Sequence, residues 1–317
     1  MSKISIPSGR AALLALCAFV FCVASASGAQ ARRRHNARRG VQQSGGQQQP
    51  SVQPKKPKKL PPGARGFEQF ANRDASDKLI TGGATRGEAK NAAEAEAMAS
   101  LDRGMEAYKA EKYDDAVQAF SRAAELEPTW FRAQYRLGMA YEAQVKYREA
   151  AAAYGKAVGL TPDEVIDEPM DFFKAQYNLA NSLALSSQHE AAVATYQKLI
   201  ESLPAAIPTP YYNLGLSYAA LGKSQEATDA LKKAIEIKPD YAEAHYNLGL
   251  IYAHDEQYPQ AIDEFRQAIK TKPGYAEARY NLALAYYLTD DRAGLAEQQK
   301  ALQAMNPKLA ADLAKLK

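Results

Sequence analysis

The repeating unit of this chain is clearest in residues 135–162, which read YRLGMAYEAQVKYREAAAAYGKAVGLTP. The unit ends in a proline, and corresponding prolines recur along the chain, so that the full set is Pro128, Pro162, Pro204, Pro239, Pro273 and Pro307. Their sequence numbers differ successively by 34, 42, 35, 34 and 34. A fixed period of about 34 residues is typical of a solenoid of helix–turn–helix units. The period therefore directs the functional question to a binding surface.

Small and bulky residues recur at fixed places within each interval. One small column consists of Gly104, Gly138, Ala180, Gly215, Gly249 and Ala283, and a second of Ala116, Ala150, Ala192, Ala227 and Ala261. Bulky residues recur around them at spacings of three, four and seven, which is the period of a helix face and not the alternation of a strand. Two helices approach closely only where side chains are small, so the small columns are expected at the crossing within each pair.

The pattern resembles the tetratricopeptide repeat, in which Leu-Gly, Tyr, Ala, an aromatic residue, Ala and Pro stand at set offsets within a unit of about 34 residues. The matching residues of the quoted stretch are Leu137, Gly138, Tyr141, Ala150, Tyr154, Ala157 and Pro162. The resemblance covers about two thirds of the chain and gives six units: 97–130, 131–164, 173–206, 208–241, 242–275 and 276–309. It implies an all-α fold, a right-handed superhelical solenoid of stacked antiparallel helix pairs over 97–309. Residues 310–317 would end a capping helix.

The two terminal units depart from this pattern. The first has Arg103 and Ala107 where Leu and Tyr are usual, and the last has Leu295, Gln299 and Leu302 where Ala, an aromatic residue and Ala are usual. Terminal repeats are expected to be atypical, because one face has no neighbouring unit to pack against.

Residues 1–31 have the form of a secretory signal. Two basic and no acidic residues precede an apolar run at 11–26, and small residues that suit cleavage follow. The run is shorter than the roughly 20 residues of a membrane span. We therefore expect an exported protein, periplasmic or secreted after cleavage, with an uncleaved anchor at 11–26 as the alternative. Cleavage would remove both cysteines, Cys17 and Cys22.

The linker at 32–66 is strongly basic and is rich in Gln, Gly and Pro. Residues 1–66 contain 12 of the 40 basic residues and no acidic residue, so the remainder has 28 basic against 36 acidic side chains. Such a segment buries too little apolar surface to order itself, and we predict that it is disordered. It is either a spacer or a contact for an anionic membrane surface or wall polymer. The export signal makes nucleic acid an unlikely partner.

Two further segments flank or interrupt the units. Residues 67–96 lead into the first unit and contain the start of its first helix. The long interval contains an eight-residue insertion, 165–172, within an acidic run, and a solvated loop is expected there.

One polar column lies on the first helix of each pair, which forms the inner wall of the superhelix in the family that the chain resembles. It consists of Arg136, Asn178, Asn213, Asn247 and Asn281, and beside it stand Tyr135, Tyr177, Tyr212, Tyr246 and Tyr280. An Asn side chain has a carbonyl acceptor and an NH₂ donor, so it can pair with both groups of a peptide backbone. The column therefore predicts a groove for an extended peptide. The alternative is that Asn only follows the average repeat of the family and that the tyrosines pack between units.

Sites for chemistry are not found in the sequence. It has no Gly-rich phosphate loop, no Cys pair and no His-Glu-x-x-His. His245 and His254 have no His or carboxylate at i+4 to complete a metal pair, and we expect surface or packing roles for the histidines. We predict neither a catalytic site nor a cofactor, a metal or a small-molecule substrate.

The sequence thus predicts an exported, non-enzymatic scaffold that binds a protein or an extended peptide in the concave groove of a repeat solenoid. The alternative is a structural or assembly subunit of a cell-envelope complex, which would use the convex or end surfaces.

Overall fold

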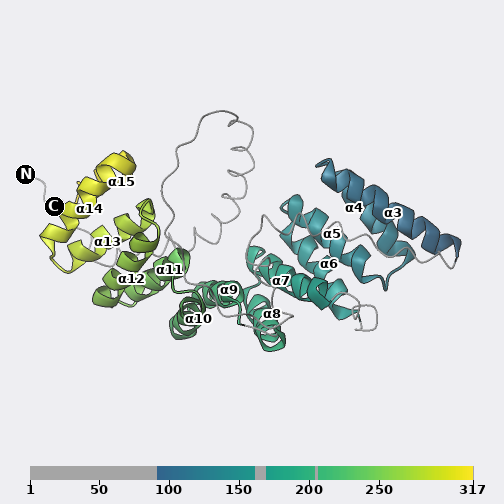
Figure 1. Ribbon diagram of the computed structural model, residues 1–317, viewed down its shortest axis with the longest axis horizontal. Coiled ribbons are helices and arrows are strands. Elements are labelled where there is room, and N and C mark those ends of the chain that lie inside the picture. Colours follow the sequence, from purple (N-terminus) through teal and green to yellow (C-terminus); the bar gives the residue numbers. More distant parts are fainter. Residues whose placement is uncertain (1–90, 161–168, 204–205, 317) are drawn as a thin grey trace, which may run out of the picture.

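The computed structural model describes residues 91–160, 169–203 and 206–316 (Figure 1). The helices in these ranges are α3 (Ala92–Lys109), α4 (Tyr113–Leu126), α5 (Phe131–Ala143), α6 (Tyr147–Gly159), α7 (Pro169–Leu185), α8 (His189–Ser202), α9 (Pro208–Ala220), α10 (Ser224–Ile237), α11 (Ala242–His254), α12 (Tyr258–Thr271), α13 (Ala276–Leu288), α14 (Arg292–Met305) and α15 (Pro307–Leu313). No strand occurs among the described residues. The predicted all-α solenoid of antiparallel helix pairs is confirmed.

Some predictions fall on other parts of the chain. The signal at 1–31, the basic linker at 32–66 and residues 67–90 of the segment before the first unit lie outside the described residues, as does the first half of the insertion. The predicted loop is wrong in its second half, because α7 begins at Pro169 and takes in residues 169–172. A proline suits the first position of a helix, where its missing N–H has no partner in any case.

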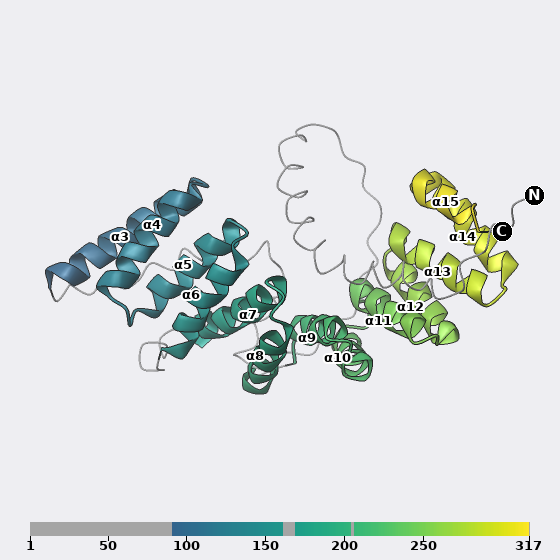
Figure 2. The same ribbon diagram turned by 180° about the vertical axis from the view of Figure 1, so that it is seen from behind.

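The helix pairs stack in chain order along a curve. Each helix contacts the next, and the first helices also contact one another across pairs, α7 with α9, α9 with α11 and α11 with α13. Figures 1 and 2 show an arc whose two ends, α3–α4 and α13–α15, rise on the same side. In the middle of the arc, α7 and α9 lie on the inner side and α8 and α10 on the outer side.

The small column marks the crossing of the two helices of a pair, as predicted. A Cβ on Gly138 would lie 2.6 Å from the ring of Tyr154, and one on Gly249 would lie 2.7 Å from the ring of Phe265. Both rings are fully buried. Glycine therefore lets an aromatic residue of the second helix rest directly on the backbone of the first.

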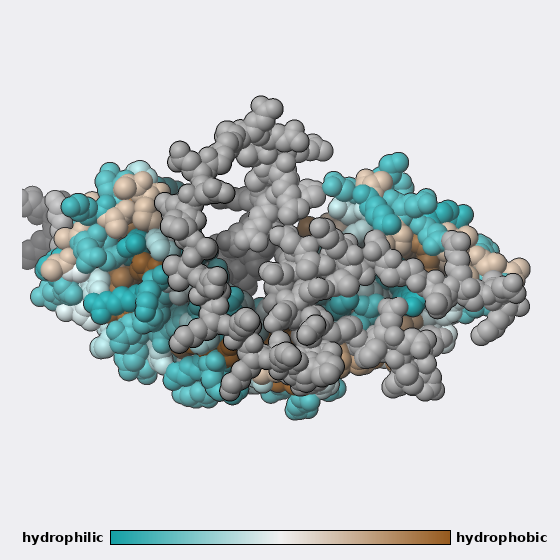
Figure 3. Space-filling model, in the orientation of Figure 1, coloured by the Kyte–Doolittle hydropathy of each residue, from teal (hydrophilic) through white to brown (hydrophobic). Residues whose placement is uncertain are grey.

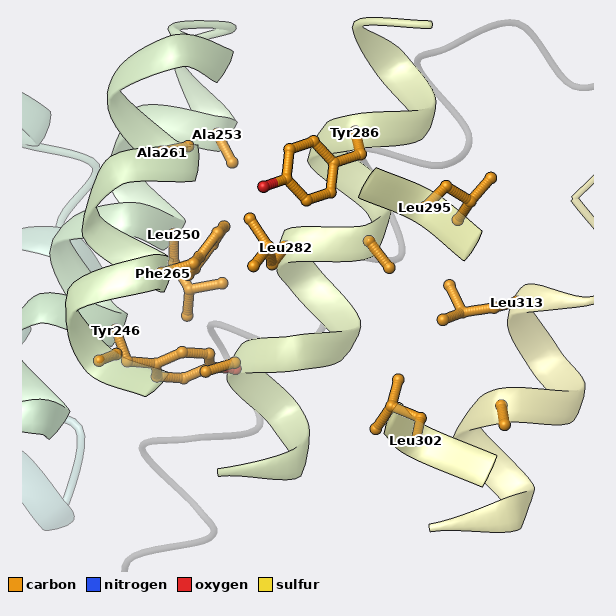
Figure 4. Close-up of a cluster of buried hydrophobic side chains, with 14 residues drawn as sticks. Tyr246, Leu250, Ala253, Ala261, Phe265, Leu282, Tyr286, Leu295, Leu302 and Leu313 are labelled. Atoms are coloured by element: carbon orange, nitrogen blue, oxygen red, sulfur yellow. The ribbon is translucent and has the colours of Figure 1, made fainter. Parts of the chain in front are cut away.

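The last pair is closed by the capping helix α15. Leu302 of α14 and Leu313 of α15 are 0% and 1% exposed and belong to one cluster with Phe265 and Leu282 (Figure 4). The large residue that replaces Ala at position 302 thus packs towards the cap, in place of a following unit.

On the face drawn in Figure 3, the surface of the described residues is mostly hydrophilic, with small hydrophobic patches between.

The turn inside each pair has the same backbone form. One residue adopts a left-handed conformation in every unit, with φ between 58° and 71°: Glu111, Val145, Ser187, Gly222, Glu256 and Asp290. In the second unit, the N–H of Lys146 donates to the carbonyl of Tyr141 at 3.0 Å and that of Val145 to Glu142 at 2.9 Å. This is the Schellman arrangement that ends many helices. Glycine suits the left-handed position best, and only Gly222 supplies it here.

Candidate partner-binding surface

The Asn column lies between successive units and bonds to the Tyr column. The side-chain NH₂ of Asn213 donates to the hydroxyl of Tyr177 at 3.1 Å. Asn247 donates in the same way to Tyr212 at 3.0 Å, and Asn281 to Tyr246 at 3.0 Å. Each bond joins the first helix of one unit to the first helix of the unit before it. We call these three contacts, between the third and fourth, fourth and fifth, and fifth and sixth units, the late junctions.

The second hydrogen of each of these amides is also bonded within the fold. Asn247 donates to the carbonyl of Glu243 at 2.7 Å and Asn281 to that of Glu277 at 3.1 Å. Asn213 donates to Oδ1 of Asn181 at 2.9 Å. Asn247 and Asn281 are only 7% and 5% exposed. The donor half of the predicted peptide contact is therefore occupied at these three positions.

The tyrosines of the column pack between units as well as bonding to Asn. The ring centroid of Tyr212 lies 5.0 Å from that of Tyr241, and the ring of Tyr246 lies 4.8 Å from Tyr275. Burial raises the pKa of both Tyr212 and Tyr246 well above its usual range. Tyr246 is 3% exposed, whereas Tyr135, Tyr177, Tyr212 and Tyr280 are half-buried.

The contact between the second and third units, which we call the early junction, is built differently. Asn178 donates to the hydroxyl of Tyr154 on the second helix of the preceding unit, at 3.5 Å, and not to the column residue Tyr135. The Tyr154 hydroxyl in turn donates to Glu142 at 3.0 Å. Arg136, which holds the Asn place in the second unit, donates to the sulfur of Met105 in α3. Asn178 and Arg136 are both half-buried.

Buried polar atoms without partners occur in the second and third units. Among the described residues, five buried side-chain atoms lack a hydrogen-bond partner: Gln134 Oε1, Gln144 Oε1, Gln176 Oε1, Ser182 Oγ and His189 Nδ1. All five belong to the second and third units. Buried polar atoms are usually paired in native proteins, so such a group of exceptions calls for an explanation.

The structure shows another polar column, which the sequence did not lead us to predict. It stands one residue before the Tyr column and consists of Gln134, Gln176, Tyr211, His245 and Arg279. His245 and Arg279 each bridge the two helices of their unit. A polar residue recurs at this place in each of these units, but the residue type differs from unit to unit, so the column is hard to recognise from the sequence. The described residues contain no group of three or more His, Cys, Asp or Glu side chains arranged for a metal ion.

Family models match most of the repeat region. One described as "TPR repeat" matches residues 215–255 and 255–290, and two described as "Tetratricopeptide repeat" match residues 101–165 and 174–206. Together the matches span more than half of the 317 residues. No curated protein matches the sequence.

Solved structures share the fold at low sequence identity. YrrB, described as a TPR protein with an unusual peptide-binding site, is 22% identical with a TM-score of 0.50, and the match covers 63% of this chain and 100% of YrrB. PilW, a type IV pilus biogenesis factor, is 16% identical with a TM-score of 0.55, over 69% of this chain and 98% of PilW. PilF of Pseudomonas aeruginosa is 14% identical with a TM-score of 0.51, over 72% and 100%. At these identities the likeness shows the fold alone.

Among the helices of the described ranges, none is long and apolar enough to span a membrane.

Proposed function

The chain is a tetratricopeptide repeat protein, and from that premise we propose that it is a non-enzymatic scaffold that holds an extended segment of a partner protein on the inner side of its arc. Proteins of this family generally bind proteins or peptides. We further propose that the contact is centred on α5, α7 and α9, the first helices of the second to fourth units.

One observation carries this placement: apart from Tyr280, which is half-buried, the column residues of the fifth and sixth units are buried, whereas those of the second to fourth units are half-buried. Tyr246, Asn247 and Asn281 are nine-tenths or more buried. In contrast, Tyr135, Arg136 and Asn178 of the early junction stay half-buried, as do Tyr177, Tyr212 and Asn213.

The chemistry of the half-buried set suits an extended chain. A guanidinium offers donors in a fixed fork, and Asn oxygens accept from backbone N–H groups. Tyrosine adds rigid apolar area with a polar tip at low entropic cost. The 3.5 Å hydrogen bond of Asn178 is also longer than the corresponding bonds of Asn213, Asn247 and Asn281, so its amide is the most weakly held within the fold.

Site-specific photocrosslinking tests the inner side against the outer side. A photoreactive amino acid would replace Asn178 on α7 and Leu216 on α9, one turn along the helix from Tyr212. Matched control positions are Lys198 on α8 and Glu226 on α10, both exposed on the outer helices. We expect one partner band from the inner positions only. A band confined to the outer positions would instead support an assembly subunit that uses its convex surface.

A second experiment separates binding from folding. Arg136→Ala with Asn178→Ala should weaken partner capture with little change in the melting temperature. Asn247→Ala with Asn281→Ala should lower the melting temperature and keep capture at temperatures where the variant is folded. Unchanged capture by the first pair would remove the early junction from the binding site.

We also propose that the protein acts outside the cytoplasm, after removal of residues 1–31. The apolar run at 11–26 and the small residues after it support this. Amino-terminal sequencing of the protein recovered from the exported fraction would show a start near residue 27 or 32. Recovery of the full chain from membranes would favour the anchor.

We propose that the basic linker is a spacer, with contact to an anionic membrane surface or wall polymer as the alternative. Co-sedimentation with vesicles, with and without phosphatidylserine, distinguishes the two. A spacer would leave the protein in the supernatant in both cases.

A further inference from the structure

His245 occupies a place in α11 that offers hydrogen-bond acceptors on both sides of its ring. The ring is buried, with 7% of the residue exposed. Its Nδ1 lies 2.6 Å from Oε2 of Glu264 in α12. Its Nε2 lies 3.0 Å from the carbonyl oxygen of Pro239, in the loop that precedes α11.

The corresponding residue of the next unit makes the same two contacts with a permanent cation. Arg279 donates through Nη1 to Oε1 of Gln298 at 3.0 Å, and through Nε and Nη2 to the carbonyl of Pro273 at 3.4 and 3.3 Å. In both units the acceptors lie 6 residues before and 19 residues after the donor. Arginine has only donors, so the repeat position is built for a side chain that donates in two directions.

A histidine meets that demand only when it carries two protons. A neutral imidazole has one N–H and one lone pair, so one of its nitrogens would face an oxygen without a hydrogen between them. Burial by itself lowers the pKa of His245, but the hydrogen bonds to Glu264 and Pro239 and the charge of Glu264 outweigh it, and the pKa is raised above its usual value.

We propose that His245 makes the fifth unit a pH-sensitive element, locked while the imidazole carries both protons and loosened when it loses one. Because the folded-state pKa is raised, the stabilisation is fully present below the unfolded value near 6.5 and is lost as the pH rises through the folded value. This pH range is the one in which histidine side chains usually change their charge.

The charged groups around the ring are carboxylates and lysines. Glu264 is the carboxylate that acts on the ring, and it also attracts the Lys232 ammonium of α10. Glu243, on the same helix as His245, pairs with Lys272 at 3.1 Å. Lysine and carboxylate side chains ordinarily titrate well above and well below neutral pH, so His245 is the group that switches.

The effect should reach both neighbouring units, because α11 is bonded on each side. Tyr246, the residue after His245, accepts the bond from Asn281, and Asn247 donates to Tyr212. A looser contact between α11 and α12 would therefore weaken two of the late junctions together.

Nuclear magnetic resonance of the full chain, labelled in histidine, measures the proton directly. We expect the ring of His245 to titrate with a midpoint above 6.5, and the variant His245→Gln to identify its signal by the loss of that resonance. A midpoint for His245 at or below 6.5 would overturn the proposal, whether or not any variant folds.

Urea unfolding at pH 5.5, 7 and 8.5 tests the consequence. The urea concentration at which half of the wild-type protein is unfolded should fall as the pH rises. The ratio of folded to unfolded protein should fall tenfold for each pH unit by which the titration midpoint of His245 exceeds 6.5. His245→Arg keeps both donors and should remove this part of the pH dependence. Equal pH dependence in wild type, His245→Arg and His245→Gln would contradict the switch.

Discussion

The early junction and the late junctions are built from the same sequence column and have different contacts. At the late junctions, Asn reaches the Tyr of the preceding first helix at 3.0–3.1 Å. At the early junction, Asn178 meets Tyr154 of a second helix at 3.5 Å. The partner changes at the one long repeat interval, between Pro162 and Pro204. Because the column residues are Asn and Tyr at all of these junctions, the spacing between units, and not the residue type, selects the partner of each Asn.

The difference extends to how well buried polar groups are paired. The five buried polar atoms without partners in the described ranges all lie in the second and third units. An unpaired buried polar atom costs about 1–3 kcal/mol, whereas a made hydrogen bond contributes about 1 kcal/mol. Among the described residues, the second and third units therefore leave buried polar atoms unpaired, whereas the fourth to sixth units do not.

The largest effect should come from the crossing within a pair, which is the same in both regions. Gly138→Val and Gly249→Val each force a Cβ to within 3 Å of a buried aromatic ring. We expect each to lower the free energy of unfolding by about 3 kcal/mol, as overpacking does. Chemical denaturation measures both. The matched control is Gly155→Ala, where the nearest atom lies 3.9 Å from the new Cβ, and it should be neutral or stabilising. A large difference in the free energy of unfolding between the two valine variants would show that the second and fifth units differ within the helix pair as well as at the junctions.

The next effect compares the Asn positions themselves. Asn281→Ala removes bonds to Tyr246 and to the Glu277 carbonyl in a site that is 5% exposed. We expect a loss of about 1–3 kcal/mol, because buried partners remain unpaired. Asn178→Ala should cost less than about 0.5 kcal/mol, since its bond is long and its site half-buried. Equal losses in urea unfolding would erase the distinction between the junctions.

Part of this structure is predictable from the sequence. The periodicity predicts the helix pairs and the crossing at Gly138, and the departures from the family pattern predict the atypical last unit, because each depends on residues within one or two adjacent helices. The bond from Asn281 to Tyr246 joins residues 35 apart, and its geometry depends on how two units stack. The sequence offered the alternatives of peptide contact and packing at the Asn column, and only the stacked structure shows that the NH₂ groups of three Asn residues are engaged.

The bridge made by His245 was out of reach for the same reason. Its acceptors are a carbonyl in a loop and a carboxylate on another helix, and neither lies at helical spacing from the ring. The start of α7 at Pro169 was missed because an acidic, proline-containing run reads as a loop, although proline is favoured at a first helical position.

A smaller effect is expected at the turn inside each pair. In the second unit the left-handed backbone position is occupied by Val145, a β-branched residue. The corresponding position of the fourth unit is Gly222. Val145→Gly should raise the free energy of unfolding by about 1 kcal/mol by relieving strain, and Gly222→Ala should lower it by about 1 kcal/mol. Thermal unfolding of both variants checks the signs. A loss in Val145→Gly would show that this exposed side chain makes a stabilising contact.

The contacts predict that the Asn and Tyr side chains are energetically coupled at the late junctions and much less at the early one. A pair of double-mutant cycles in urea measures this coupling directly, one with Tyr246→Phe and Asn281→Ala and the other with Tyr154→Phe and Asn178→Ala. We expect a coupling energy of about 0.5–2 kcal/mol in the first cycle and less than about 0.3 kcal/mol in the second. Equal coupling in the two cycles, or a larger value at the early junction, would show that the junctions do not differ in this way.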